Sequence, residues 1–210
     1  PRSSGRQKIT AWTLTLPDGS AVATTDAWGN VLHVLTLDNP HKEITIRASG
    51  IVDIAEEGDD IGAEPQELLS PLVFLRCTPL TRADGPIREF AQRWYQPEAQ
   101  EESLNRLMAE LLLRMPYSPG ATQVQDSAAD AFARAKGVCQ DHTHVFLACC
   151  RALEIPARYV SAYAWRLDPP DFHAVVEAWL RGPDGRGGWY LFDPTRLSAP
   201  EGIVRIGVGR

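Results

Sequence analysis

The sequence has no hydrophobic run that approaches the roughly 20 residues needed to cross a bilayer. It also has no basic cluster, because its 21 lysines and arginines are scattered among 27 acidic residues, for a formal net charge of −6. A surface that binds nucleic acid needs concentrated positive charge. We therefore expect a protein that binds neither nucleic acid nor a membrane.

Cysteine is scarce as well. The four cysteines, Cys77, Cys139, Cys149 and Cys150, are too few for a disulfide scaffold in 210 residues. They predict free thiols in a reducing compartment, and residues 1–8 are polar and basic, with no secretory signal behind them. We therefore expect a cytoplasmic protein. The chain lacks an initiator methionine, which also fits a fragment or a processed product.

Two regions differ in their patterning. Residues 1–65 form a β-rich region, in which alternating segments over 9–16, 21–25, 31–37 and 44–54 predict a meander of antiparallel strands. The acidic stretch 55–65 contains Gly58 and Gly62 and is typical of a linker or an exposed loop. Residues 66–210 turn to helical periodicity and then to strands, which predicts a second unit.

This second unit is predicted to begin with helices over 86–95, 101–114, 127–135 and 139–153. The helix over 101–114 has apolar residues at spacings of three and four, and the next one has Asp126 or Ser127 as its N-cap and Gly137 just past its end. Strands follow over 157–165, 173–180 and 189–192, the last two as a hairpin through 182–188. These elements make the fold class α+β.

Cys139 opens the helix over 139–153, directly after Gly137 and Val138. A thiol at a helix N-terminus faces unpaired N–H groups and the positive end of the helix dipole, which favour the reactive thiolate. The same N–H groups can stabilise an oxyanion beside the sulfur. The alternative is a small buried hydrophobic residue, which is our interpretation of Cys77, Cys149 and Cys150.

A nucleophilic cysteine needs a base, and His173 is the best placed of the five histidines. It opens a strand just after a proline-containing loop, and Asp193 ends the strand predicted to pair with it. The hairpin predicts that the two side chains are neighbours, with Asp193 orienting the imidazole. Taken singly, His173 can be a surface residue and Asp193 a turn residue. We interpret His142 and His144 as structural or surrounding residues.

Three blocks, at 137–142 (Gly-Val-Cys-Gln-Asp-His), 155–161 (Ile-Pro-Ala-Arg-Tyr-Val-Ser) and 189–195 (Trp-Tyr-Leu-Phe-Asp-Pro-Thr), with His173 in a strand, resemble the core of bacterial transglutaminase-like proteins. The segment 26–30 is similar to the region that commonly precedes that core. The resemblance implies a small antiparallel β region (1–65) ahead of a papain-like cysteine-enzyme core (66–210), and a Cys139–His173–Asp193 triad.

We place Tyr117, Gln140, Asp141 and His142 around this triad, as residues near the oxyanion or just behind the site. Tyr117 lies upstream of the cysteine, where related enzymes have an aromatic residue bordering the site; the alternative is a core or surface tyrosine in a loop. The chain departs from the family pattern at 173–177, where it has His-Ala-Val-Val-Glu instead of His-Ala-Trp-x-Glu. This departure concerns substrate preference more than the triad.

Two other functions compete with this interpretation. A metal site could use Cys139, His142, His144 and Cys149, but four ligands on one continuous helix point in different directions and cannot converge. A catalytically silent scaffold or interaction module would be expected to have lost the triad, whereas all three residue types are present. The sequence gives no reason to expect a metal or another cofactor.

The function expected from these residues is acyl transfer on the amide bonds of a protein or peptide substrate, through a thioester on Cys139. An amine acceptor would make the enzyme a transglutaminase, whereas water would make it a protease or amidase. The triad chooses neither acceptor, and it leaves the substrate and the oligomeric state open. The sequence therefore predicts a cysteine-dependent acyl-transfer chemistry with the acceptor left open.

Overall fold

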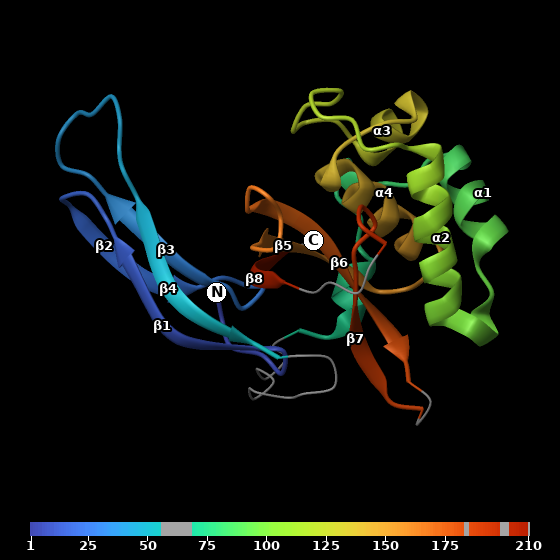
Figure 1. Ribbon diagram of the computed structural model, residues 1–210, viewed down its shortest axis with the longest axis horizontal. Coiled ribbons are helices and arrows are strands. Elements are labelled where there is room, and N and C mark those ends of the chain that lie inside the picture. Colours follow the sequence, from blue (N-terminus) through green and yellow to red (C-terminus); the bar gives the residue numbers. More distant parts are fainter. Residues whose placement is uncertain (56–68, 183–184, 198–201, 210) are drawn as a thin grey trace.

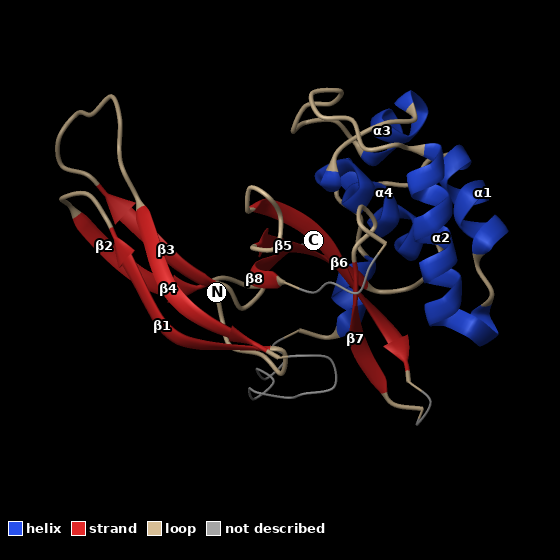
Figure 2. Ribbon diagram, viewed as in Figure 1, coloured by secondary structure: helices blue, strands red, loops and turns tan. Residues whose placement is uncertain are grey.

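The computed structural model describes residues 1–55, 69–182, 185–197 and 202–209, and it combines helices with antiparallel strands (Figures 1 and 2). The elements in chain order are β1 (Gln7–Thr15), β2 (Ser20–Thr25), β3 (Val31–Thr36), β4 (Arg47–Ile54), η1 (Pro71–Leu75), η2 (Pro79–Thr81), α1 (Gly85–Trp94), η3 (Pro97–Ala99), α2 (Gln100–Arg114), α3 (Ala128–Arg134), α4 (Cys139–Ala152), β5 (Ala157–Ala164), β6 (Asp171–Arg181), β7 (Gly187–Phe192) and β8 (Ile203–Gly209). The predicted linker over 55–65 lies almost wholly outside the described residues.

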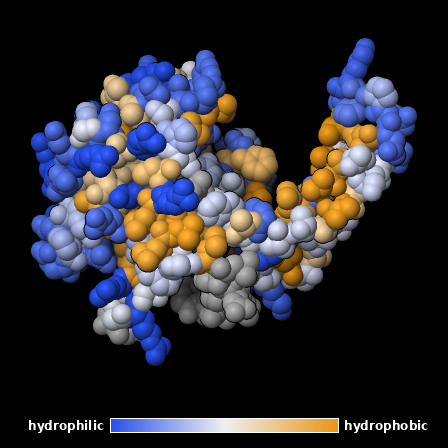
Figure 3. Space-filling model, turned by 180° about the vertical axis from the view of Figure 1, so that it is seen from behind, coloured by the Kyte–Doolittle hydropathy of each residue, from blue (hydrophilic) through white to orange (hydrophobic). Residues whose placement is uncertain are grey.

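The N-terminal strands are antiparallel, but they do not form the predicted meander. β1 pairs with β4, and β2 pairs with β3, which makes two separate two-stranded sheets. The turn residues at 17–19 mark where the chain changes direction, but they do not say which strand lies beside β1. Figure 3 shows apolar side chains along these projecting ribbons, where Val22 and Ile51 are 62% and 60% exposed.

The helices form as the apolar spacing predicts. In α2, Leu104, Leu107 and Leu111 are fully buried, because residues three and four apart share the face that packs on the core. Ser127 caps α3 by accepting the backbone N–H of Asp130. α3 ends at Arg134, Ala135 adopts the left-handed conformation at its C-terminus, and Gly137 lies just past this end.

The four-stranded sheet has the order β7-β6-β5-β8, with every neighbouring pair antiparallel. α4 packs against β5 and β6, and the four helices bury their apolar faces in one core with this sheet. β8 was not predicted from the sequence, since its residues lie far along the chain from its partner β5. The sheet brings His173 on β6 close to the end of β7.

Two side-chain amides fix the N-terminal region to the edge strand β8. Gln7 donates from Nε2 to the carbonyl oxygen of Arg205 at 3.0 Å and accepts the N–H of the same residue at 2.8 Å. Asn30 makes the same reciprocal pair with Val208, at 2.7 and 2.8 Å. Each amide thus copies the hydrogen bonds that a neighbouring strand would make.

The segment 26–30 builds the turn that presents Asn30. Asp26 Oδ1 accepts the backbone N–H groups of Trp28 and Asn30, and Asp26 Oδ2 accepts the side-chain amide of Asn30. The ring of Trp28 lies 5.4 Å from that of Phe74 in η1. The segment therefore attaches the N-terminal region to the core by both apolar and polar contacts.

Candidate active site

Cys139 is the first residue of α4, as predicted, and its side chain is half-buried. Asp141 closes the start of the helix by accepting the N–H of Val138 at 2.8 Å and the hydroxyl of Thr122 at 2.6 Å. A Cβ added to Gly137 would lie 2.6 Å from the Cβ of Asp141, so only glycine fits beside this cap. The thiol is therefore held at the positive end of a capped helix.

The other cysteines differ in their surroundings. Cys149 and Cys150 are fully buried in α4, and burial raises the pKa of both thiols, that of Cys150 to about 12. Both match the prediction of apolar packing residues. Cys77 does not, because it is exposed; it follows η1, outside the apolar stripes of the helices, so no packing draws it into the core.

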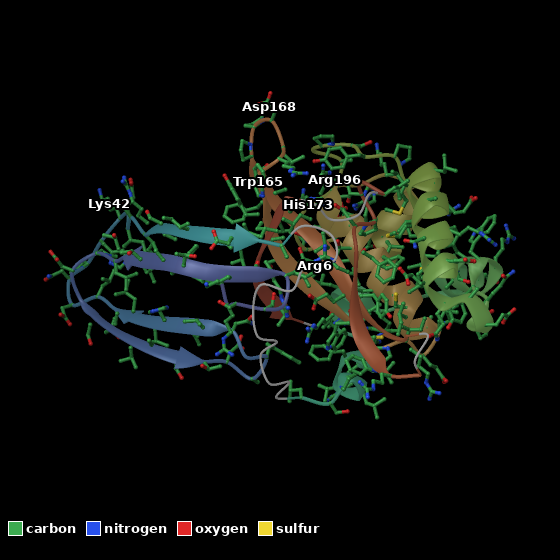
Figure 4. The ribbon with its side chains drawn as sticks, turned by 60° about the horizontal axis from the view of Figure 1, so that its bottom comes forward. Arg6, Lys42, Trp165, Asp168, His173 and Arg196 are labelled. Atoms are coloured by element: carbon green, nitrogen blue, oxygen red, sulfur yellow. The ribbon has the colours of Figure 1, made fainter. Side chains whose placement is uncertain are left out.

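His173 and Asp193 meet as the hairpin register predicts. His173 Nε2 lies 2.8 Å from Asp193 Oδ2, and the two residues are only 8% and 1% exposed. The last paired residue of β7 is Phe192, opposite Val176, so Asp193 follows β7 where β6 runs on toward His173. His173 is the third residue of β6 and not the first. Figure 4 shows it at the end of the sheet from which the loop carrying Asp168 projects.

The charge of His173 is set by its two partners. Burial by itself would lower the pKa of the imidazole, but the hydrogen bonds to Asp193 and Cys139, with the negative charges of both, raise it to about 9. Because Nε2 is bonded to Asp193, Nδ1 is the nitrogen left for the thiol. At neutral pH the ring is therefore an imidazolium between a carboxylate and the sulfur.

Asp193 is fixed on its other oxygen as well. Oδ1 accepts the backbone N–H groups of Thr195 and Arg196 at 3.0 and 3.1 Å, in the turn that follows β7. Pro194 lies between these residues and the strand, so the chain leaves the ladder at once. The carboxylate is thus held by one turn and directed at one imidazole.

The structure places His142 and His144 behind the site. His142 is fully buried and contacts the carbonyl oxygen of Met115 and the hydroxyl of Thr195, at 2.8 and 3.1 Å. His144 packs on Tyr159, with ring centroids 5.7 Å apart. Burial lowers the pKa of both histidines. Within the described ranges, no three His, Cys, Asp or Glu side chains are grouped as metal ligands.

Tyr117 and Gln140 make different contacts near the nucleophile. Tyr117 is half exposed, and burial followed by the negative charges of Cys139 and Asp171 raises the pKa of its phenol, which places the hydroxyl within the field of the thiol. A bridge between Tyr117 and Gly137 aligns the two segments. The side chain of Gln140 instead donates to the carbonyl oxygen of Val124.

Two residues near the site were not singled out from the sequence. Burial, and then the charges of Cys139 and Asp141, raise the pKa of Tyr159 to about 12, so this phenol also lies near the thiol. Thr195 contacts both Asp193 and His142. Both residues fall inside the sequence blocks that carry the family resemblance, and this position is the only signal in the sequence that could have identified them. Nothing local distinguishes them from packing or turn residues.

No helix within the described residues is both long enough and apolar enough to cross a membrane.

Known proteins resemble this chain over its whole length. An uncharacterised protein of Mycobacterium leprae is 28% identical over 233 residues, which cover 100% of this chain and 79% of the relative. An uncharacterised protein of Mycobacterium tuberculosis is 28% identical over 236 residues, covering 100% and 75%. The crystal structure of a candidate cysteine protease from Cytophaga hutchinsonii matches with a TM-score of 0.61 and 26% identity, over 99% of this chain and 72% of that one.

Two family models match separate parts of the chain. The bacterial transglutaminase-like N-terminal region matches residues 1–53, which include β1 to β3 and most of β4. The transglutaminase-like superfamily core matches residues 88–194, just over half of the chain, and this match includes Cys139, His173 and Asp193. The chain belongs to the transglutaminase-like superfamily and carries the N-terminal region of its bacterial members.

Proposed function

We propose that this protein is a cysteine-dependent enzyme that transfers acyl groups from amide bonds of peptides or proteins through a thioester on Cys139. The observation that carries the proposal is the buried His173–Asp193 pair, with its 2.8 Å contact, beside a half-buried thiol at the start of α4. A surface histidine and a turn aspartate have no reason to be buried together at a helix N-terminus. Membership of the superfamily supports the same chemistry.

In the first step, the thiol proton lies on His173, and the Cys139 sulfur attacks the amide carbonyl carbon. The oxyanion forms beside the first N–H groups of α4, which are free to donate because they have no partner within the helix. The imidazolium then gives its proton to the leaving nitrogen, the C–N bond breaks, and a thioester remains. Asp193 keeps the imidazole oriented and stabilises its positive charge throughout.

In the second step, an acceptor attacks the thioester carbonyl and gives a proton to His173. The C–S bond then breaks, and the thiolate–imidazolium pair is restored. Water as the acceptor gives amide hydrolysis, whereas a primary amine gives a new amide. The likeness to the candidate cysteine protease favours water.

The proposal is tested with dimethylated casein, supplied with and without a fluorescent primary amine. We expect new amino termini or released ammonia when water is the acceptor, and fluorescent casein when the amine is. Cys139→Ala should abolish either product. Cys77→Ala is the matched control, because Cys77 is an accessible thiol to which we assign no base.

Labelling with iodoacetamide at neutral pH tests the nucleophile without a substrate. Cys139 should react well before Cys77, although Cys77 is the more exposed of the two. Reaction of Cys77 first, or equal labelling of both thiols, would contradict the assignment. The catalytically silent scaffold would then be the better description.

A further inference from the structure

The orientation of the Asp193 carboxylate depends on the backbone of the turn after β7. Its Oδ2 faces His173 at 2.8 Å, and its Oδ1 is held by the N–H groups of Thr195 and Arg196. A carboxylate with partners on both oxygens cannot rotate without losing one of them. The position of residue 195 therefore decides whether the carboxylate points at the imidazole.

The side chain of Thr195 is held by His142. His142 Nε2 lies 2.8 Å from the carbonyl oxygen of Met115, which can only accept, so Nε2 carries the hydrogen. Burial lowers the pKa of His142, despite the Met115 carbonyl and the charges of Asp141 and Asp193, so the ring is neutral at pH 7. Nδ1 is then an acceptor, and the Thr195 hydroxyl donates to it at 3.1 Å.

One buried ring therefore joins three segments. Met115 directly follows α2, His142 belongs to the first turns of α4, and Thr195 lies in the turn after β7. His142 is fully buried, so its two hydrogen bonds have no water to replace them. The chain of contacts runs without a gap from α2 to the carboxylate beside His173.

We propose that Thr195 and His142 are positioning residues, which together hold the turn that directs Asp193 at His173. Neither residue needs to touch the substrate, and both act through Asp193. The proposal rests on the proposed function for its consequence in catalysis. The orientation of Asp193 itself can be measured without a substrate.

The test compares Thr195→Val with Thr143→Val. Both changes replace a hydroxyl by a methyl group, and Thr143 is a fully buried residue of α4 whose hydroxyl has no partner among the described residues. The probe is iodoacetamide, and its reaction with Cys139 is followed from pH 6 to pH 10. Thr195→Ser, which keeps the hydroxyl, should behave as the unmodified protein.

In Thr195→Val, a misdirected Asp193 stabilises the imidazolium less, so the thiolate–imidazolium pair is less populated near neutral pH. We expect the rate of Cys139 alkylation at pH 6–7 to fall about tenfold. A change of this size corresponds to the loss of roughly one hydrogen bond to a charged group. Above about pH 9.5 the difference should disappear, because His173 has then lost its proton in both proteins. NMR of the His173 ring in Thr195→Val should show a pKa below that of the unmodified protein, which is about 9. The charged groups that act on this ring are Asp193 and Cys139, and it in turn acts on neutral His142.

A purely structural role predicts other results. Thr195→Val would then leave the alkylation of Cys139 unchanged or slow it equally at every pH, and either result would overturn the proposal, whereas a lower melting temperature is expected under both roles. His142→Phe gives a second test, because it removes the acceptor for Thr195 and keeps a ring. It should reproduce the pH-selective loss, and Thr195→Val should add little to it. If casein is not turned over but the alkylation pattern holds, the proposed function fails and the positioning roles stand.

Discussion

At the scale of single residues, the charge on His173 governs how the site responds to pH. Burial opposes this charge, and the contacts with Asp193 and Cys139 outweigh burial, which raises the pKa from 6.5 to about 9. The folded protein therefore binds this proton more tightly than the unfolded chain does. Folding stability must then depend on pH through this residue.

The sign follows from the direction of that shift. The contribution of His173 to stability is complete below about pH 6.5, falls as the pH rises, and is lost above about pH 9. We expect the unmodified protein to lose stability across this window and His173→Gln to lose less. Chemical denaturation at pH 6, 7.5 and 9.5 measures the difference. If the free energy of unfolding falls equally with pH in the two proteins, His173 does not carry the raised pKa.

At the scale of single elements, the start of α4 places the nucleophile. Asp141 binds both the N–H of Val138 and the hydroxyl of Thr122, so one carboxylate fixes the helix end and the preceding loop. A negative charge in the first turn also interacts favourably with the helix dipole. The position of Cys139 is therefore a property of this cap.

Asp141→Ala should destabilise the protein by about 1–2 kcal/mol, in the range found when a hydrogen bond that caps a helix start is lost. It should also slow alkylation of Cys139, because the first turn that carries the thiol loosens. Asp130→Ala is the matched control, since Asp130 closes a similar capping box at the start of α3. Thermal unfolding and alkylation rates are measured for both variants. Equal rates of Cys139 alkylation in the two variants would show that the Asp141 cap does not control the reactivity of the thiol.

Much of the core and of the candidate site follows from local patterns. The stripe of leucines predicts α2, and the cysteine after a helix break predicts the start of α4. The turn over 182–188 predicts that His173 meets Asp193, because hairpin pairing is set by chain neighbours. The pairing of β1 with β4, and β8 beside β5, depend on contacts between distant segments that no local pattern encodes. His142 is placed near the triad by the sequence, but its hydrogen bond with Thr195 escapes prediction for the same reason.

At the scale of the whole molecule, the N-terminal region is attached to the core through side-chain hydrogen bonds to β8 and an aromatic contact. Gln7 and Asn30 bind β8, and Trp28 packs on Phe74, whereas β2 is exposed along its entire length. A two-stranded ribbon has little stability of its own. The folded state of this region therefore depends on its attachment to the core.

Asn30→Ala should release the N-terminal region without disturbing the active site. It removes both hydrogen bonds to Val208 and the contact with Asp26, so amide exchange should become faster in 203–209 and in 20–36. Alkylation of Cys139 should be unchanged. Hydrogen–deuterium exchange measures the effect, with Asn39→Ala as an exposed control. Exchange that is equal in both variants would mean that Asn30 does not hold the region.

The amides of Gln7 and Asn30 also have a consequence for solubility. β8 is the outer strand of its sheet, and a strand with free backbone groups is a template on which another chain can add a strand. The two amides occupy the backbone groups of Arg205 and Val208, at two points along this edge. We therefore expect the attached N-terminal region to reduce aggregation through this edge of the sheet that carries His173.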